Sequence, residues 1–149
     1  METVSDLLRM KGSQVLTIYG NKTVEDAIAT LVEHNVGSLL VLGEQHEIVG
    51  IITERDILRK CYHKGPDIAK MKVNEAMTGK DELIVSLPED RLDYILQVMT
   101  QNRIRHIPVV DGANLLGILS IGDVVKAQLA MVRTENHYLR DYLGDKYPG

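Results

Sequence analysis

Two short polar clusters follow apolar runs, and their residue types could bind a polar ligand. The first reads GIITERD, from Gly50 to Asp56, and the second reads GILSIGD, from Gly117 to Asp123. Each has a hydroxyl three residues before an aspartate, where a strand is expected to lead into a helix. Free backbone N–H groups at a helix start favour an anion such as phosphate. The aspartate can accept hydrogen bonds from a diol.

The same spacing is also a helix-capping pattern, with a hydroxyl at the cap and an acid in the first turn. Thr23 and Asp26 show it too, and we assign them only the capping role. The spacing by itself favours the capping role over ligand binding at all three pairs. The repeated, glycine-led context favours an added ligand role at Asp56 and Asp123, because a cap leaves lone pairs free.

The two clusters belong to a divergent internal duplication. Residues 23–42 align with 91–110 at an offset of 68, which becomes 67 from Gly50 onward. Each half predicts helix, strand, strand, helix. The expected strands are residues 38–42, 48–53, 107–110 and 115–120. Thr23 and Asp90 are the expected caps of the first helices, and the second helices should begin near residues 54 and 121.

We divide the chain into a first repeat with an N-terminal helix (1–65), a connector (66–80) and a second repeat with an extended C-terminal helix (81–149). The connector should hold a short helix around 72–77, with residues 3–12 as its counterpart. The fold class is α/β (α+β), with small sheets and flanking helices. Asp111-Gly112 predicts a tight turn between the last two strands.

Composition excludes several classes. The 149 residues are 44% hydrophobic and 26% charged, which is typical of a soluble domain. The net charge of −4 argues against a large nucleic-acid surface. A single cysteine, Cys61, leaves no internal disulfide. The start lacks a signal-peptide pattern, and no apolar run approaches the roughly 20 residues that span a bilayer. We therefore expect a cytoplasmic protein.

The sequence offers no catalytic constellation, so we expect no enzyme and no catalytic cofactor. Cys61 and His63 are two residues apart on an expected helix and point to different sides. The remaining histidines have no metal-ligand spacing, so no metal site is expected. The positions without a chemical assignment are His34, His46 and His137.

The duplicated motifs, together with IRHIPVV at 104–110, resemble those of a CBS-domain pair, also called a Bateman module. The resemblance runs from about Val4 to the last helix. It implies tandem CBS repeats whose two small sheets pack with pseudo-two-fold symmetry. It further implies a regulatory module that binds adenosine ligands such as AMP, ADP, ATP, NAD(H) or S-adenosylmethionine. The alternative is a structural, protein-interaction or dimerisation module with vestigial clefts.

The resemblance implies two composite clefts, each joining the aspartate motif of one repeat to the strand entrance of the other. The first would contain Thr53, Asp56, Arg105, His106, Ile107 and Pro108. The second would contain Thr17, Ile18, Gly37, Ser38, Arg55, Ser120, Gly122 and Asp123. The guanidinium of Arg55 suits bidentate phosphate binding. Gly122, at the matching position, offers no side chain, so positive charge should differ between the clefts.

The expected partners are an adenosine nucleotide, a second copy of the chain and a separate regulated protein, because no output domain is evident. CBS pairs commonly dimerise, and the tail residues Tyr138, Leu139 and Tyr142 could pack against a second subunit. Nucleic acid and membrane are not expected partners.

Overall fold

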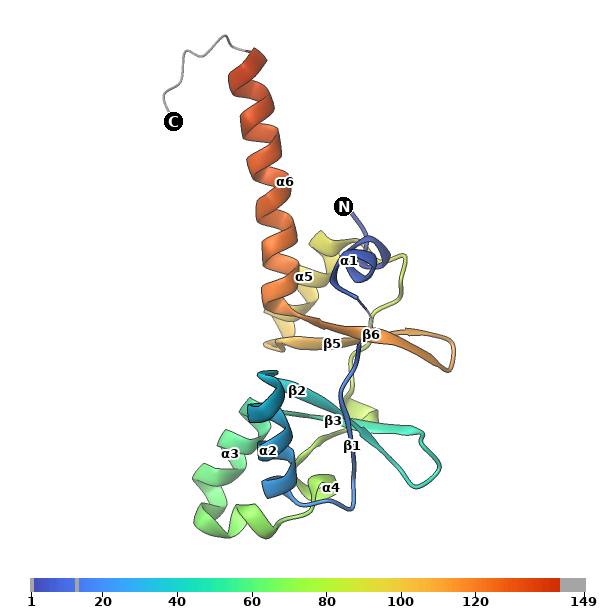
Figure 1. Ribbon diagram of the computed structural model, residues 1–149, viewed down its shortest axis with the longest axis vertical. Helices are drawn as coiled ribbons and strands as arrows, with labels where there is room; N and C mark the ends of the chain where they lie inside the picture. Colours follow the sequence, from blue (N-terminus) through green and yellow to red (C-terminus); the bar gives the residue numbers. More distant parts are fainter. Residues whose placement is uncertain (1, 13, 143–149) are drawn as a thin grey trace. The chain divides into compact units, whose positions relative to one another are not determined.

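The computed structural model describes residues 2–12 and 14–142, and on the last helix it describes side chains only as far as residue 133. The chain forms two compact units (Figure 1). Residues 14–84 make the central unit. Residues 1–13 and 85–149 make the terminal unit, so the N-terminal segment belongs with the second repeat in space although it precedes the first repeat in sequence.

The central unit contains a four-stranded sheet in the order β1-β2-β3-β4. The strands are β1 (Thr17–Tyr19), β2 (Ser38–Leu42), β3 (Ile48–Thr53) and β4 (Thr78–Gly79). Strand β1 runs parallel to β2, and the other two pairs are antiparallel. The helical elements are α2 (Val24–His34), α3 (Glu54–Lys64), η1 (Gly65–Lys70), α4 (Val73–Ala76) and η2 (Lys80–Glu82).

The core of the central unit lies between its sheet and its helices. Alternate strand residues face the helices because successive side chains of a strand point to opposite faces. Those strand residues are Leu39, Val41 and Ile52, and they meet Val24, Ala27 and Leu31 of α2 and Ile68, Val73 and Ala76 of the connector. Of the helically spaced apolar positions 24, 27, 28 and 31, three therefore mark the buried face of α2, whereas Ile28 is 38% exposed.

Helix α2 begins at the predicted cap, Thr23, and ends at Asn35. The Asp26 N–H donates to Thr23 Oγ1 at 3.2 Å, and the Thr23 N–H donates to Asp26 Oδ2 at 3.1 Å. At the other end Asn35 is left-handed, with φ of 52°, and its N–H reaches the carbonyls of Leu31 and Val32. Asparagine tolerates this conformation well, so it stops the helix before β2.

The terminal unit contains the hairpin of β5 (His106–Asp111) and β6 (Asn114–Ser120), with α1 (Val4–Lys11), α5 (Leu92–Asn102) and α6 (Ile121–Tyr142). Asp111 pairs with Asn114 across the turn, and Gly112 has a φ of 61°. The turn predicted at Asp111-Gly112 is confirmed. The buried residues of this unit include Leu92, Ile95 and Met99 of α5, Ile107, Val109 and Leu119 of the hairpin, and Val124 and Ala127 of α6.

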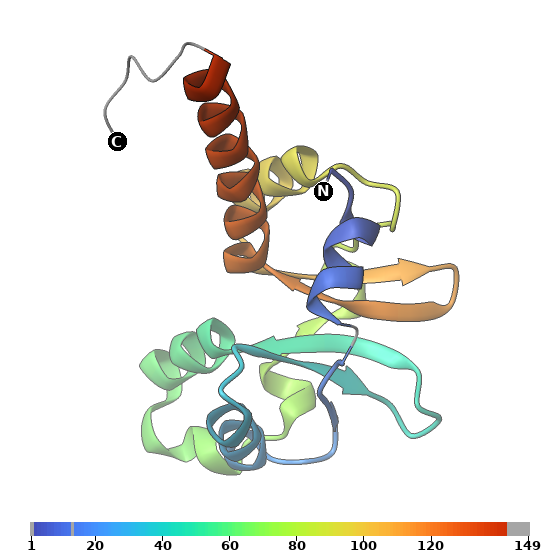
Figure 2. The same ribbon diagram turned by 45° about the horizontal axis from the view of Figure 1, so that its top comes forward.

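Helix α1 and helix α4 are counterparts, as predicted. In the central unit the Val24 N–H donates to the Met71 carbonyl and the Val73 N–H donates to the Lys22 carbonyl, both at 2.8 Å. The terminal unit repeats the arrangement. Its bonds run from Val4 N–H to the Asp90 carbonyl and from Leu92 N–H to the Glu2 carbonyl. Figure 2 shows α1 beside the β5–β6 hairpin.

The strand predictions for residues 38–42 and 48–53 are confirmed, whereas β5 is one residue longer at each end and β6 begins one residue earlier. The prediction of Asp90 as a helix cap is wrong. Helix α5 has Arg91 at its N-cap, without a side-chain capping bond. The Asp90 carboxylate instead accepts from the Leu87 N–H at 2.9 Å and the Ser86 hydroxyl at 3.2 Å. Asp90 therefore stabilises the preceding turn.

Candidate functional site

Both glycine-led motifs form capping boxes at the junction of a strand and a helix. The Asp56 N–H donates to Thr53 Oγ1 at 3.1 Å, and the Thr53 N–H donates to Asp56 Oδ2 at 3.0 Å. Ser120 and Asp123 exchange the same two bonds, at 3.1 and 3.0 Å. The capping role is confirmed for both motifs. In each box the carboxylate accepts one backbone N–H, which gives it a defined orientation.

Two further capping boxes in the chain have the same geometry. Thr23 with Asp26 forms one, and Thr3 with Asp6 forms the other, with bonds of 3.1–3.2 Å. The backbone and hydroxyl bonds from Glu2 and Thr3 lower the pKa of Asp6 to about 2. Capping geometry alone therefore does not distinguish Asp56 and Asp123, and their surroundings have to be compared.

In each unit the start of one strand, β2 or β5, lies beside the motif of the same repeat. Ser38 pairs with Thr53, and the Gly37 carbonyl accepts from the Glu54 N–H at 3.0 Å. In the terminal unit His106 pairs with Ser120 in the same way. The Arg105 carbonyl there accepts from the Ile121 N–H at 2.8 Å. The two repeats thus build the same strand–helix corner.

The structure places every predicted ligand-binding residue at these corners or on the strands beside them. Thr17 and Ile18 lie on β1, opposite Leu40 and Val41 of β2. Seven of the residues belong to the central unit, namely Thr17, Ile18, Gly37, Ser38, Thr53, Arg55 and Asp56. The other seven belong to the terminal unit, namely Arg105, His106, Ile107, Pro108, Ser120, Gly122 and Asp123. Each predicted cleft combines residues of both units, so the clefts remain predictions.

Asp56 has a neutral neighbour that the sequence analysis missed. Thr78 of β4 donates its hydroxyl to Asp56 Oδ1 at 3.2 Å. Strand β4 pairs with β3 at Ile51 and Gly50, which places Thr78 next to the motif. No sequence spacing signals this contact, because β4 is two residues long and the hydroxyl lies 22 residues from the carboxylate.

Asp123 has a charged neighbour, Lys11, which the sequence analysis also missed. Lys11 Nζ lies 2.6 Å from Asp123 Oδ2 and donates to the Ile118 carbonyl at 2.6 Å. The two side chains are 32% and 28% exposed. Partial burial raises the pKa of Asp123, but the bonds from Lys11 and Ser120 outweigh it and leave that pKa below its usual value. The separation of 112 residues explains why no local pattern pointed to Lys11.

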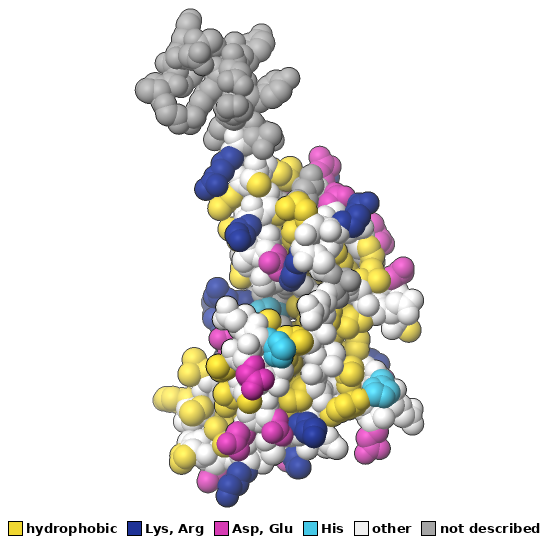
Figure 3. Space-filling view, in the orientation of Figure 1, with side chains coloured by type: hydrophobic (Ala, Val, Ile, Leu, Met, Phe, Trp, Pro, Cys, Tyr) yellow, Lys and Arg dark blue, Asp and Glu magenta, His cyan; other side chains and the backbone are white. Residues whose placement is uncertain are grey.

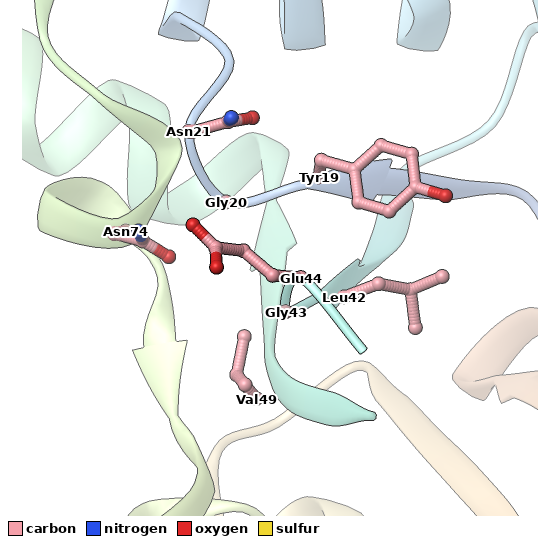
Figure 4. Close-up of a pocket in the computed structure, with 8 residues that line it drawn as sticks. All are labelled: Tyr19, Gly20, Asn21, Leu42, Gly43, Glu44, Val49 and Asn74. Carbon is pink, nitrogen blue, oxygen red and sulfur yellow. The ribbon is translucent and has the colours of Figure 1, made fainter. Parts of the chain in front are cut away.

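The central unit also has a hollow of about 320 Å³ away from its motif (Figure 4). It is lined by Tyr19, Gly20, Asn21, Leu42, Gly43, Glu44, Val49 and Asn74. It lies at the turn between β2 and β3, whereas Ser38 and Thr53 are at the opposite ends of those strands. None of the predicted residues lines it, so the strand–helix corners remain the candidate site.

Among the residues that the structure describes, no three His, Cys, Asp or Glu side chains are grouped to hold a metal ion. Within the same part of the chain, no helix is both long and apolar enough to cross a membrane.

The family model for the CBS domain matches residues 3–63 and 73–130. The chain therefore belongs to the CBS domain family, and it carries two copies of the domain. CBS domain pairs commonly serve as regulatory ligand-binding modules. The two matches cover both strand–helix corners, so the duplication found in the sequence is the pair of CBS domains.

Relatives cover most of the chain. The CBS domain-containing protein CBSX3, mitochondrial, of Arabidopsis thaliana is 41% identical over 151 residues, covering 97% of this chain and 73% of its own length. Among solved structures, the CBS-domain containing protein ATU1752 from Agrobacterium tumefaciens is 35% identical, with a TM-score of 0.82. That match covers 85% of this chain and 93% of the other.

Two more distant structures carry information on ligands and assembly. The CBS domain pair of protein MJ0100 was solved in complex with 5′-methylthioadenosine and S-adenosyl-L-methionine. It is 25% identical, with a TM-score of 0.73, and the match covers 87% of this chain and 97% of that one. A CBS-CP12 protein from bloom-forming cyanobacteria is hexameric. It is 28% identical, with a TM-score of 0.71, over 97% of this chain and 89% of that one.

Proposed function

We propose that this protein is a regulatory module that binds an adenosine nucleotide in clefts formed by both repeats and responds by changing conformation or partner binding. The observation that carries the proposal is the duplicated corner, in which a capped helix start holds an oriented aspartate beside a strand entrance. Adenosine-containing ligands in the MJ0100 pair support the ligand class.

The residues at each corner have complementary chemistry for a nucleotide. Asp56 and Asp123 are oriented acceptors for ribose hydroxyls, as acidic residues are in other nucleotide folds. Phosphate would be bound by helix N–H groups and by the basic side chains Arg55, Arg105 and His106. A ligand contacted by both units would favour the arrangement of the units that it binds best. This differential affinity would carry the regulatory signal.

We propose no catalytic activity, because these corners offer acceptors and cations but no activated nucleophile. Cys61 is exposed on α3, away from the capped helix start. The regulated protein would be a separate partner. A cytoplasmic location remains a prediction, and CBSX3 is named as mitochondrial.

A second candidate function is that of a dimerisation or protein-interaction module, with clefts that bind nothing. Exposed apolar side chains on α2 and α3 of the central unit favour an interaction surface. Val32, Leu58 and Tyr62 are 73%, 71% and 86% exposed, and Ile28 is 38% exposed. Figure 3 shows hydrophobic side chains over α3. Helix α6 adds Val125, Leu129 and Val132, and the side chains of Tyr138, Leu139 and Tyr142 lie outside the described residues.

Thermal unfolding with AMP, ADP, ATP, NAD⁺, NADH and S-adenosylmethionine tests the proposal, with guanosine nucleotides as controls. A ligand at 100 times its dissociation constant should add about 2.7 kcal/mol. That corresponds to a rise in Tm of roughly 5–11 °C for a domain of this size. The rise should be lost in Asp56→Ala or Asp123→Ala.

Asp26→Ala is the matched control, because Asp26 forms the same capping box without a predicted ligand role. It should lower the Tm of the free protein yet retain the ligand-induced rise. If no adenosine ligand raises the Tm at millimolar concentration, the sensor function is wrong. The interaction module would then be the better assignment.

A further inference from the structure

Lys11 makes the two motif aspartates chemically different. Its ammonium bridges Asp123 Oδ2 and the Ile118 carbonyl, both at 2.6 Å, from the last residue of α1. Hydrogen bonds between ions of opposite charge are roughly twice as strong as those between neutral groups. The corresponding neighbour of Asp56 is the Thr78 hydroxyl, which is neutral. One corner therefore contains a carboxylate beside a hydroxyl, and the other contains an ion pair.

The ion pair restricts how a diol can reach Asp123. Oδ2 accepts from both the Ser120 N–H and Lys11 Nζ. A ribose diol that uses both carboxylate oxygens has to share Oδ2 with these donors or displace Lys11. A displaced ammonium next to a partly buried carboxylate needs a new anionic partner, because separating the pair costs its attraction. A phosphate on the same ligand would supply that partner, whereas an uncharged nucleoside would not.

We propose that Lys11 is a specificity-determining residue, which makes the Asp123 corner select phosphorylated nucleosides over uncharged ones. Lysine suits the role because a flexible four-carbon stem lets its ammonium exchange one anion for another. The inference rests on the proposed function and concerns residues of the terminal unit alone.

Arg9 provides a matched control on the same helix. Its guanidinium pairs with Asp6 Oδ1 at 2.7 Å, and its side chain is 74% exposed. Asp6 forms a capping box like that of Asp123 but has no predicted ligand role. Removing the Arg9 charge therefore changes the net charge as much as removing that of Lys11, without touching the Asp123 corner.

The experiment measures the dissociation constants of AMP and adenosine by calorimetry. The parent is the full chain with Asp56→Asn, which weakens the first corner and keeps a cap acceptor at that position. Lys11→Met, Lys11→Arg and Arg9→Met are then added separately. AMP should bind the parent more tightly than adenosine, and Lys11→Met should reduce this preference about ten-fold, the loss expected for one charged contact. Lys11→Arg and Arg9→Met should retain the preference, and thermal unfolding checks that each variant folds.

An unchanged preference in Lys11→Met would overturn the inference and leave the proposed function standing. Equal weakening of AMP and adenosine would also overturn it, because Lys11 would then only orient Asp123. If AMP and adenosine bind the wild type but not the Asp56→Asn parent, the inference is also overturned, because the Asp123 corner then binds neither ligand. If the wild type binds none of the adenosine ligands, the proposed function fails and the inference fails with it.

Discussion

The side chain of Leu8 lies against Gly117 so closely that a Cβ at Gly117 would be 2.8 Å from Leu8 Cδ2. The counterpart in the other repeat is Gly50, where a Cβ would lie 2.8 Å from the sulfur of Met77 and would clash with the Thr78 carbonyl oxygen. Both CBS domains therefore have a glycine where a short helix segment closes over the strand. The close approach explains why the glycines that open the two motifs recur at matching positions.

Gly50→Ala should destabilise the protein more than Gly117→Ala does. At Gly117 the methyl group meets the end of a leucine side chain, which can turn away. At Gly50 it meets backbone of β4, which cannot move without breaking the β3–β4 pairing. Overpacking typically costs about 1–3 kcal/mol. Urea unfolding should put Gly50→Ala at or above this range and Gly117→Ala near its lower end. Gly79→Ala is the control, because nothing lies within 4 Å of a Cβ there.

The capping hydroxyls should contribute to stability whether or not a ligand binds. Thr23→Ala and Thr53→Ala each remove an acceptor for a first-turn N–H, at 3.2 and 3.1 Å. Each substitution should lower the free energy of unfolding by about 1 kcal/mol, measured by urea denaturation without nucleotide. Only Thr53→Ala should also weaken nucleotide binding. If both variants reduced binding equally, the motif would have no ligand role beyond its cap.

Acid should reduce stability through the capping carboxylates. The bonds from Glu2 and Thr3 lower the pKa of Asp6 to about 2 from 3.8. Partial burial raises the pKa of Asp123, but the bonds from Lys11 and Ser120 leave it below its usual value. Because the folded pKa is below the unfolded one, the stabilisation is present above about pH 4 and is lost as the pH falls through the folded pKa.

Asp6→Asn should therefore flatten the fall in unfolding free energy between about pH 4 and pH 2, and Asp123→Asn should flatten it below about pH 4. Urea midpoints measured across this range check both. The control is Asp67→Asn, in the first turn of η1 and outside the capping boxes. If the wild type and Asp6→Asn lose stability in parallel, the low pKa of Asp6 is wrong.

The exposed apolar residues of α2 and α3 should form a dimer interface. Leu58→Glu and Tyr62→Glu place a charge where the side chains are 71% and 86% exposed, so they should weaken association with little effect on the fold. Analytical ultracentrifugation should show a dimer for the wild type and a smaller species for these variants. Gln45→Glu, in the exposed turn between β2 and β3, should leave the mass unchanged. A wild-type monomer at high concentration would contradict the prediction.

The sequence by itself determined the repeated local structure. A hydroxyl three residues before an aspartate specifies a capped helix start at four places, where the pairs form capping boxes because their partners are close in the chain. Thr78 and Asp81 have the same spacing without a capping box, since η2 has Gly79 at its N-cap and no side-chain capping bond. Apolar spacing predicted β2, β3 and most of the buried face of α2, because the period of a strand or a helix is a local property of the chain. The predicted cap at Asp90 failed because Ser86 and Leu87 compete for that carboxylate in the preceding turn.

Only the tertiary structure decided which groups meet the motif aspartates. Strands β1 and β4 are too short to show a period, and Thr78 reaches Asp56 only through the pairing of β4 with β3. Lys11 reaches Asp123 across 112 residues because α1 packs in the unit of the second repeat. Contacts between distant segments leave no local pattern. The charge of Lys11 beside Asp123 therefore became visible only once the chain was folded.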